Sequence, residues 1–153
     1  MADALIYTLL TTLETAIKAN PGIAPGNVAL GRLETLTEEQ LPYVAIFLND
    51  DVSLGDNGAN NTNFIDWNVS VNIELTVTAL STESLDKAYL DLRALVHNSI
   101  MEDETLGLNF CLFAVPEGSD EPALTDDPER RLAVYRTSWI FRIRTSVKDI
   151  TTL

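Results

Sequence analysis

The segment that most constrains the fold is residues 64–80, FIDWNVSVNIELTVTAL, in which apolar and polar side chains alternate. Odd positions from Trp67 to Ala79 are apolar, and even positions from Asn68 to Thr78 are polar. Strict period two predicts a β-strand with one face on a core and one polar face, as in antiparallel sheets. At about 3.3 Å per residue the strand would be roughly 55 Å long. We therefore expect it either to bend or to project as an arm whose unpaired edges need a partner.

Two other segments have the spacing of amphipathic helices. Residues 3–19 place apolar side chains at i, i+3, i+4 and i+7, with Asp3 as the expected N-cap and Asn-Pro-Gly at 20–22 as the stop. Residues 81–101 carry a second apolar stripe, with Ser81 or Thr82 as the expected cap. The inner positions of this second helix are Leu85, Ala88, Tyr89, Leu92, Leu95, Val96 and Ile100.

Three further apolar runs predict strands at 41–48, 108–115 and 132–146, and the Pro-Gly turns of 21–40 predict irregular or short-stranded structure. The order α-β-β-α-β-β with long hairpin strands predicts a single α+β domain over residues 1–153. We expect a two-layer sandwich, with a mainly antiparallel or mixed sheet and two helices packed on one face.

The polar stretch 49–63, NDDVSLGDNGANNTN, raises three hypotheses: a metal-binding loop, a substrate loop, or a segment that orders only against a partner. A calcium loop of the EF-hand type needs oxygen ligands at positions 1, 3 and 5, glycine at 6 and glutamate at 12. With Gly58 at position 6, Gly55 falls at position 3 and Phe64 at position 12, so the pattern fails. We expect no metal ion, and a loop that orders, if at all, against a neighbouring subunit or another protein.

The chain carries no recognisable catalytic motif. Its one histidine, His97, excludes sites that need two histidines, and its one cysteine, Cys111, lies in an apolar run typical of a buried structural thiol. Phosphate-binding glycine loops, nucleophile elbows and CxxC pairs are absent from the sequence. Among the 23 acidic residues, Asp66 beside Trp67 is the nearest candidate for a carboxyl group with a raised pKa. We expect no enzyme activity, no catalytic residue and no cofactor.

A net charge of −13 argues against binding nucleic acid by phosphate neutralisation and against binding anionic membranes. No apolar run approaches the length of a membrane span, and the first twenty residues, MADALIYTLLTTLETAIKAN, lack the features of a signal peptide. A lone cysteine fits a reducing compartment. These features favour a protein that is made and assembled in the cytoplasm and has no membrane partner.

Three of the ten basic residues, Arg136, Arg142 and Arg144, lie on one face of the predicted strand 132–146. One interpretation is cross-strand pairing with Glu74 on a polar sheet face. The other is a contact between subunits, in which these arginines bind the acidic residues of a neighbour. The second interpretation predicts the interface residues Arg136, Arg142, Arg144, Arg130, Arg131, Asp50, Asp51 and Asp56.

The order and character of five segments resemble the tail terminator proteins of long-tailed, lambda-like bacteriophages. These segments are the opening helix, LPYVAIFLND, WNVSVNIELTVTA, SLDKAYLDLRALVHNSIMEDETLG and YRTSWIFRIR. The resemblance covers most of the chain and implies a mixed sheet flanked by helices. It also implies a virion protein at the head-proximal end of the tail, forming a hexameric ring that caps the tail tube, stops its polymerisation and joins the head connector. DNA would pass through this ring without specific binding. The family supplies no residue motif to transfer.

Two other classes of function stay open at this stage. The chain could be another phage neck or head-completion protein, or a small acidic adaptor that binds a protein through its polar loops. An acidic hydrolase without a known motif is a third hypothesis, which a hydrolase assay across pH would test. Tail-tube and tape-measure genes beside the gene for this protein would favour the tail terminator.

Overall fold

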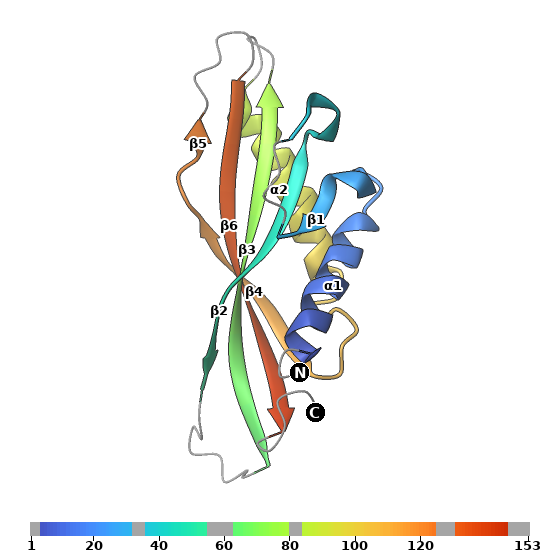
Figure 1. Cartoon of the computed structure of the whole chain (residues 1–153), viewed down its shortest axis with the longest axis vertical. Helices are drawn as coiled ribbons and strands as arrows, with labels where there is room; N and C mark the ends of the chain where they lie inside the picture. Colours follow the sequence, from blue (N-terminus) through green and yellow to red (C-terminus); the bar gives the residue numbers. More distant parts are fainter. Residues whose placement is uncertain (1–3, 32–35, 55–62, 80–83, 125–130, 147–153) are drawn as a thin grey trace.

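The computed structural model describes residues 4–31, 36–54, 63–79, 84–124 and 131–146 (Figure 1). The main elements, in chain order, are α1 (Ala4–Lys18), β1 (Val28–Leu30), β2 (Tyr43–Ser53), β3 (Phe64–Ala79), α2 (Leu85–Met101), β4 (Cys111–Ser119), β5 (Ala123–Leu124) and β6 (Arg131–Ser146). Two 3-10 turns, Pro25–Asn27 and Glu38–Gln40, flank β1 in the sequence. The predicted elements are therefore present, with β1 as the short strand expected in the Pro-Gly region.

The strands form one open sheet in the order β1-β2-β3-β6-β4, with β5 also paired to β6. Only β1 and β2 are parallel; the other pairs are antiparallel. Helix α2 packs over β3 and β6, and α1 packs over β1, β2 and α2. Buried side chains from both helices and the odd positions of β3 form one hydrophobic core. The predicted α+β fold, with two helices on one face of a mixed, mostly antiparallel sheet, is confirmed.

The core forms where the apolar stripes of the helices pack against the apolar face of the sheet. The odd residues Val69, Val71, Ile73 and Leu75 of β3 are fully buried, as alternation predicts. The expected stripe of α2 also faces the core: Tyr89, Leu92, Val96 and Ile100 are buried, and Leu85, Ala88 and Leu95 pack against the core. Burying each such side chain contributes about 1.5–3 kcal/mol to folding, before the opposing loss of conformational entropy.

Strand β3 is as long as predicted, but its edges are not open. It pairs with β6 along its whole length, from Phe64 opposite Ser146 to Ala79 opposite Arg131. On its other side β2 covers residues 67–76. The expectation of an arm with unpaired edges is therefore wrong over residues 67–76, where β3 has an antiparallel neighbour on each side. Figure 1 shows that the long strands twist strongly along their length.

The first part of the stretch 49–63 belongs to a strand and not to the loop between strands. Residues 49–53 continue β2, and Ser53 still pairs with Trp67. A register shift between Leu48 and Asp50 marks a β-bulge at Asn49, which lets the strand continue through polar residues. Our expectation of a loop from residue 49 onward is wrong for these five residues, and residues 55–62 lie outside the described part of the chain.

Two other boundaries differ from the prediction. Strand β4 begins at Cys111 instead of residue 108, because Leu106 (φ 53°) and Gly107 (φ 68°) form a left-handed turn before it. Helix α2 begins after Ser84, whose hydroxyl accepts a hydrogen bond from the backbone N–H of Lys87 at 3.3 Å. The expected caps Asp3, Ser81 and Thr82 lie outside the described residues.

Candidate subunit interface

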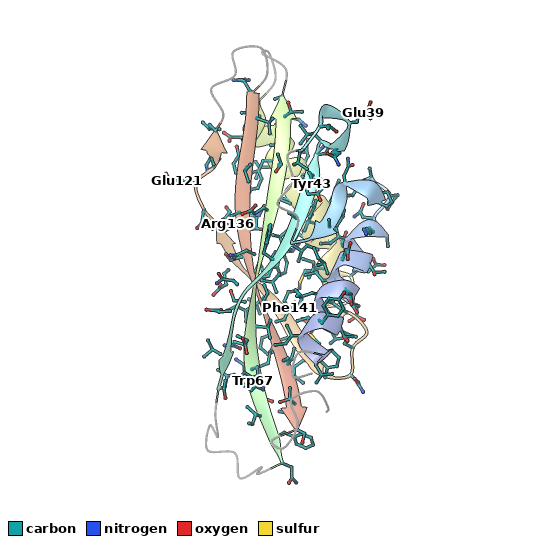
Figure 2. The ribbon with its side chains drawn as sticks, in the orientation of Figure 1. Glu39, Tyr43, Trp67, Glu121, Arg136 and Phe141 are labelled. Atoms are coloured by element: carbon teal, nitrogen blue, oxygen red, sulfur yellow. The ribbon has the colours of Figure 1, made fainter. Side chains whose placement is uncertain are left out.

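The face of the sheet opposite the helices carries a ladder of polar side chains. It is built from the even positions of β3 and of β6, whose register places Glu74 opposite Arg136, Asn68 opposite Arg142 and Asp66 opposite Arg144. We call this surface the open face. Figure 2 shows Phe141 on the helix side of the sheet, whereas Arg136 lies away from the helices. The three arginines of the predicted stripe therefore share one surface.

Arg136 pairs with Glu74 across the two strands. Its Nη2 and Nε donate to Glu74 Oε1 at 2.8 and 3.3 Å. The side chain of Arg136 remains 51% exposed and that of Glu74 26% exposed, so solvent screens the pair and it contributes little to stability. The predicted cross-strand pair is confirmed. The predicted contact of Arg136 with a neighbouring subunit stays a prediction.

Arg144 forms a two-point ion pair with Asp66. Nε donates to Oδ1 at 2.7 Å and Nη2 donates to Oδ2 at 3.0 Å. The hydrogen bonds from Arg144 hold the pKa of the Asp66 carboxyl below its ordinary value, and the charge of Arg142 adds to this effect. Asp66 was the nearest sequence candidate for a raised pKa, and that hypothesis is wrong because the arginines favour the charged carboxylate.

Arg142 is placed differently from the other two arginines. Its Nε donates to the side-chain oxygen of Asn68 at 2.8 Å, and its guanidinium carbon lies 5.1 Å from the ring centre of Phe113. Within the described residues no carboxylate forms an ion pair with it. Arg142 is thus the member of the stripe that lacks a carboxylate partner of its own.

Of the other predicted interface residues, Asp50 shares the open face with the stripe, whereas Asp51 lies on the helix side of the sheet. Asp50 and Asp51 are exposed on β2. Arg131 is exposed at the start of β6, where its backbone carbonyl accepts from the Thr78 hydroxyl at 3.1 Å. Arg130 and Asp56 lie outside the described residues. Among the described residues no ion pair joins Asp50 or Asp51 to the arginines of the stripe, and their contact with a neighbouring subunit stays a prediction.

Among the described residues, two edges of the sheet have no neighbouring strand, and both lie at the same level along the long strands. Strand β1 pairs only with Val44–Ile46, so the outer edge of β2 from Phe47 to Val52 has no strand beside it among the described residues. On the other side β4 is the last strand in the described sheet. Both edges lie beside the same stretch of the central pair, since β2 reaches residue 67 of β3 and β4 pairs with residues 137–143 of β6.

Both open edges carry features that limit indiscriminate pairing. Each is interrupted by β-bulges, one in β2 at Asn49 and two in β4, and β4 also contains Pro116, which lacks a backbone N–H. Charged residues occupy both edges, with Asp50 and Asp51 on β2 and Glu117 on β4. Natural sheets use these devices against aggregation, so any partner at these edges has to match particular side chains.

Comparisons with known proteins add no family assignment. No protein-family model matches the chain, and the comparison with curated proteins found no match. The functional interpretation therefore depends on the residues themselves.

The remaining candidate groups have structural surroundings. Cys111 is buried, and burial raises the pKa of its thiol to about 11, which disfavours the reactive thiolate. No cluster of three or more metal-binding side chains occurs within the described ranges. None of the helices in those ranges combines the length and apolar character needed to cross a membrane.

The sequence analysis considered His97 of α2 alone and missed Arg93, one helical turn before it. Arg93 and His97 are half-buried and line a depression beside the end of β4. They stand four residues apart, so they share one flank of the helix. The spacing was visible in the sequence, but periodicity alone assigns such residues to a solvated face, and only the fold places β4 next to them.

Proposed function

We propose that this protein is a structural subunit that assembles head to tail into a closed ring, and that the ring is the tail terminator of a long-tailed phage. The resemblance in element order is the reason for proposing the tail terminator family. The observation that carries the ring is the pair of open sheet edges at the same level of the sheet. A contact between two different edges repeats from copy to copy and closes when the rotation fits, as heterologous interfaces do.

In this role the ring, a hexamer by the family resemblance, binds the end of the tail tube. It stops addition of tube subunits and presents its other surface to the head connector. The activity is one of binding and capping, without catalysis or a cofactor. A net charge of −13 would repel the phosphates of DNA passing through the ring and keep the subunits soluble before they assemble. The site of action is the head-proximal end of the tail in the virion.

The open face supplies a second supporting feature. This face brings together three arginines, Arg136, Arg142 and Arg144, and the acids Asp50, Asp66 and Glu74, in a chain that carries a net charge of −13. Exposed apolar residues, Val52 on β2 and Val115 on β4, lie on the same face. A surface that mixes exposed apolar groups with arginine is typical of protein interfaces.

The test is the mass of the purified protein in solution, alone and with tail-tube protein, followed by electron microscopy. We expect a ring of fixed stoichiometry, either alone or on the tube end, and shorter tubes when the protein is added during polymerisation. A protein that stays monomeric and never binds tubes would contradict the proposal.

The stripe is tested by reversing Arg142 and Arg144 to Glu. Because Arg142 forms no ion pair with a described carboxylate and Arg144 is 40% exposed, we expect assembly to weaken more than the melting temperature of the monomer falls. Arg142→Gln is the milder control, since it removes the charge and leaves the Asp66–Arg144 pair intact. Equal losses of assembly and of stability would assign the stripe a structural role only.

A further inference from the structure

The depression beside α2 is the strongest unassigned feature of the described residues. It lies on the helix side of the sheet, where the end of β4 meets β6. Its lining includes Arg93, His97, Pro116, Gly118, Ser138 and Trp139. Gly118 has a φ of +136° and open space where a Cβ would lie, so no side chain fills this part of the rim.

Arg93 has no carboxylate partner in the described part of the chain. Its guanidinium carbon lies 5.9 Å from the ring centre of Tyr89, and none of the ion pairs involves it. His97 packs its ring against Trp139 at 5.4 Å between ring centres. Arg136 and Arg144, in contrast, are each held by a carboxylate.

The chemistry of this pair selects a carboxylate as its ligand. The chain has 23 acidic and 10 basic residues, so an arginine without a carboxylate partner stands out. A guanidinium donates two parallel hydrogen bonds to a carboxylate, and a half-buried position strengthens such a pair relative to open solvent. In an assembly of identical copies, the nearest abundant source of carboxylates is the neighbouring copy.

Asp51 is the carboxylate that the sheet geometry places correctly. It is exposed on the open edge of β2 and lies opposite Val69, which is fully buried under the helices. Paired residues share a face, so Asp51 is on the same side of the sheet as α2. Asp50 lies opposite Ser70 and belongs to the open face instead.

Within one molecule the two groups stand on opposite edges. Val69 pairs with Phe141, and Phe141 pairs with Ala114, two residues before Pro116 at the depression. The strands β3 and β6 therefore separate Asp51 from the β4 edge, a distance of roughly 14 Å at about 4.8 Å per strand. In a head-to-tail ring, rotation keeps each face pointing the same way, so the β2 edge of one copy meets the β4 edge of the next on a common face.

We propose that Arg93, with His97 beside it, binds the Asp51 carboxylate of a second copy of this chain. The proposal rests on the proposed ring and names the two edges that form its repeating contact. It also adds a basic group on α2 to the contact, beside the arginines of β6.

The experiment measures the concentration at which the purified protein assembles, by light scattering, for the wild type, Arg93→Glu, Asp51→Arg and the double variant. Each single reversal is expected to raise the assembly midpoint by about tenfold or more, because it places like charges together. The double variant exchanges the charges across the contact and is expected to recover most of that loss. Glu104→Arg, an exposed acid in the turn after α2, changes the net charge as Asp51→Arg does and is expected to leave assembly unweakened.

The outcomes separate this proposal from the proposed function. A wild type that never assembles overturns the ring itself. Rings that form normally in both single variants overturn the Arg93–Asp51 contact and leave the ring standing. Single variants that weaken assembly without recovery in the double variant overturn Asp51 as the ligand. Far-ultraviolet circular dichroism and melting of each variant establish that folding is intact.

Discussion

Phe141 and Arg142 are neighbours in β6, yet they lie in opposite surroundings. Phe141 is fully buried under the helices, whereas Arg142 lies half-buried on the open face against Asn68 and Phe113. The same contrast repeats along β3 and β6, since each successive side chain changes face. The covered face therefore determines whether the chain folds. The open face tolerates charges that contribute little to stability and can be used for contacts between copies.

The largest expected effect concerns the covered face. Phe141→Ala removes a fully buried ring from the centre of the core and is expected to lower the free energy of unfolding by about 3–5 kcal/mol. The matched change on the adjacent open-face position, Ile140→Ala, is expected to lower it by about 1 kcal/mol or less. Urea denaturation followed by tryptophan fluorescence measures both. Equal losses would mean that the open face is covered within the folded monomer.

An intermediate effect is expected for the polar group at the margin of the covered face. The Tyr135 hydroxyl donates to Asp86 Oδ1 at 2.9 Å, and its ring stacks on Tyr89 at 3.9 Å between centres. Tyr135→Phe keeps the stack and loses the hydrogen bond, so we expect a loss of about 1–2 kcal/mol by urea denaturation. A loss near zero would show that water replaces the hydroxyl without penalty.

Tyr135 also predicts how stability depends on high pH. Burial and the nearby Asp86 raise the pKa of Tyr135 to about 12 from an ordinary 10. Because the folded state holds the proton more tightly, this contribution is complete below pH 10 and is lost as pH rises through 12. Tyr135→Phe should remove that part of the pH dependence.

A smaller effect is expected for the ion pair of Arg136 with Glu74 on the open face. Both side chains reach solvent, so Glu74→Gln should lower the free energy of unfolding by only about 0.2–1 kcal/mol. The loss should shrink further in 1 M salt, which screens exposed charges. A loss above 2 kcal/mol that persists in salt would contradict the statement that charges on the open face contribute little to stability.

The smallest effect is the acid dependence of Asp66. Its hydrogen bonds from Arg144 lower its pKa in the folded state from the ordinary 3.8. The resulting stability is complete above pH 3.8 and is lost as pH falls through the lower folded pKa. Asp66→Asn should therefore flatten the stability curve below pH 4 and leave the difference between pH 6 and 8 unchanged. An unchanged acid slope would show that Asp66 is not held by Arg144 in solution.

The sequence predicted the helices and strands well where periodic apolar residues face the hydrophobic core. Alternation over 64–80 predicted β3 to within one residue, and the helical stripe of α2 matched the buried set from Tyr89 to Ile100. It predicted less well the polar end of β2, where the strand continues past a β-bulge. Asn49–Ser53 continue a strand because β3 supplies backbone partners, a long-range effect that composition cannot reveal.

The interface was predictable only in part. The arginine stripe followed from period two, and the structure places its members on one face. Arg93 was missed because its importance depends on the end of β4, which lies beside α2 only after folding. The sequence pattern suggested Glu74 as a cross-strand partner of the arginines. It could not predict that Asp66 pairs with Arg144, because that pairing depends on the register of β3 against β6.

The most direct test of this account is the mass of the wild-type protein across a hundredfold range of concentration, measured by sedimentation. We predict a single assembled species of fixed size that does not grow further as the concentration rises, because a head-to-tail contact that closes leaves no free edge. A monomer at every concentration, with or without tail-tube protein, would contradict the ring. So would an open series of ever larger polymers.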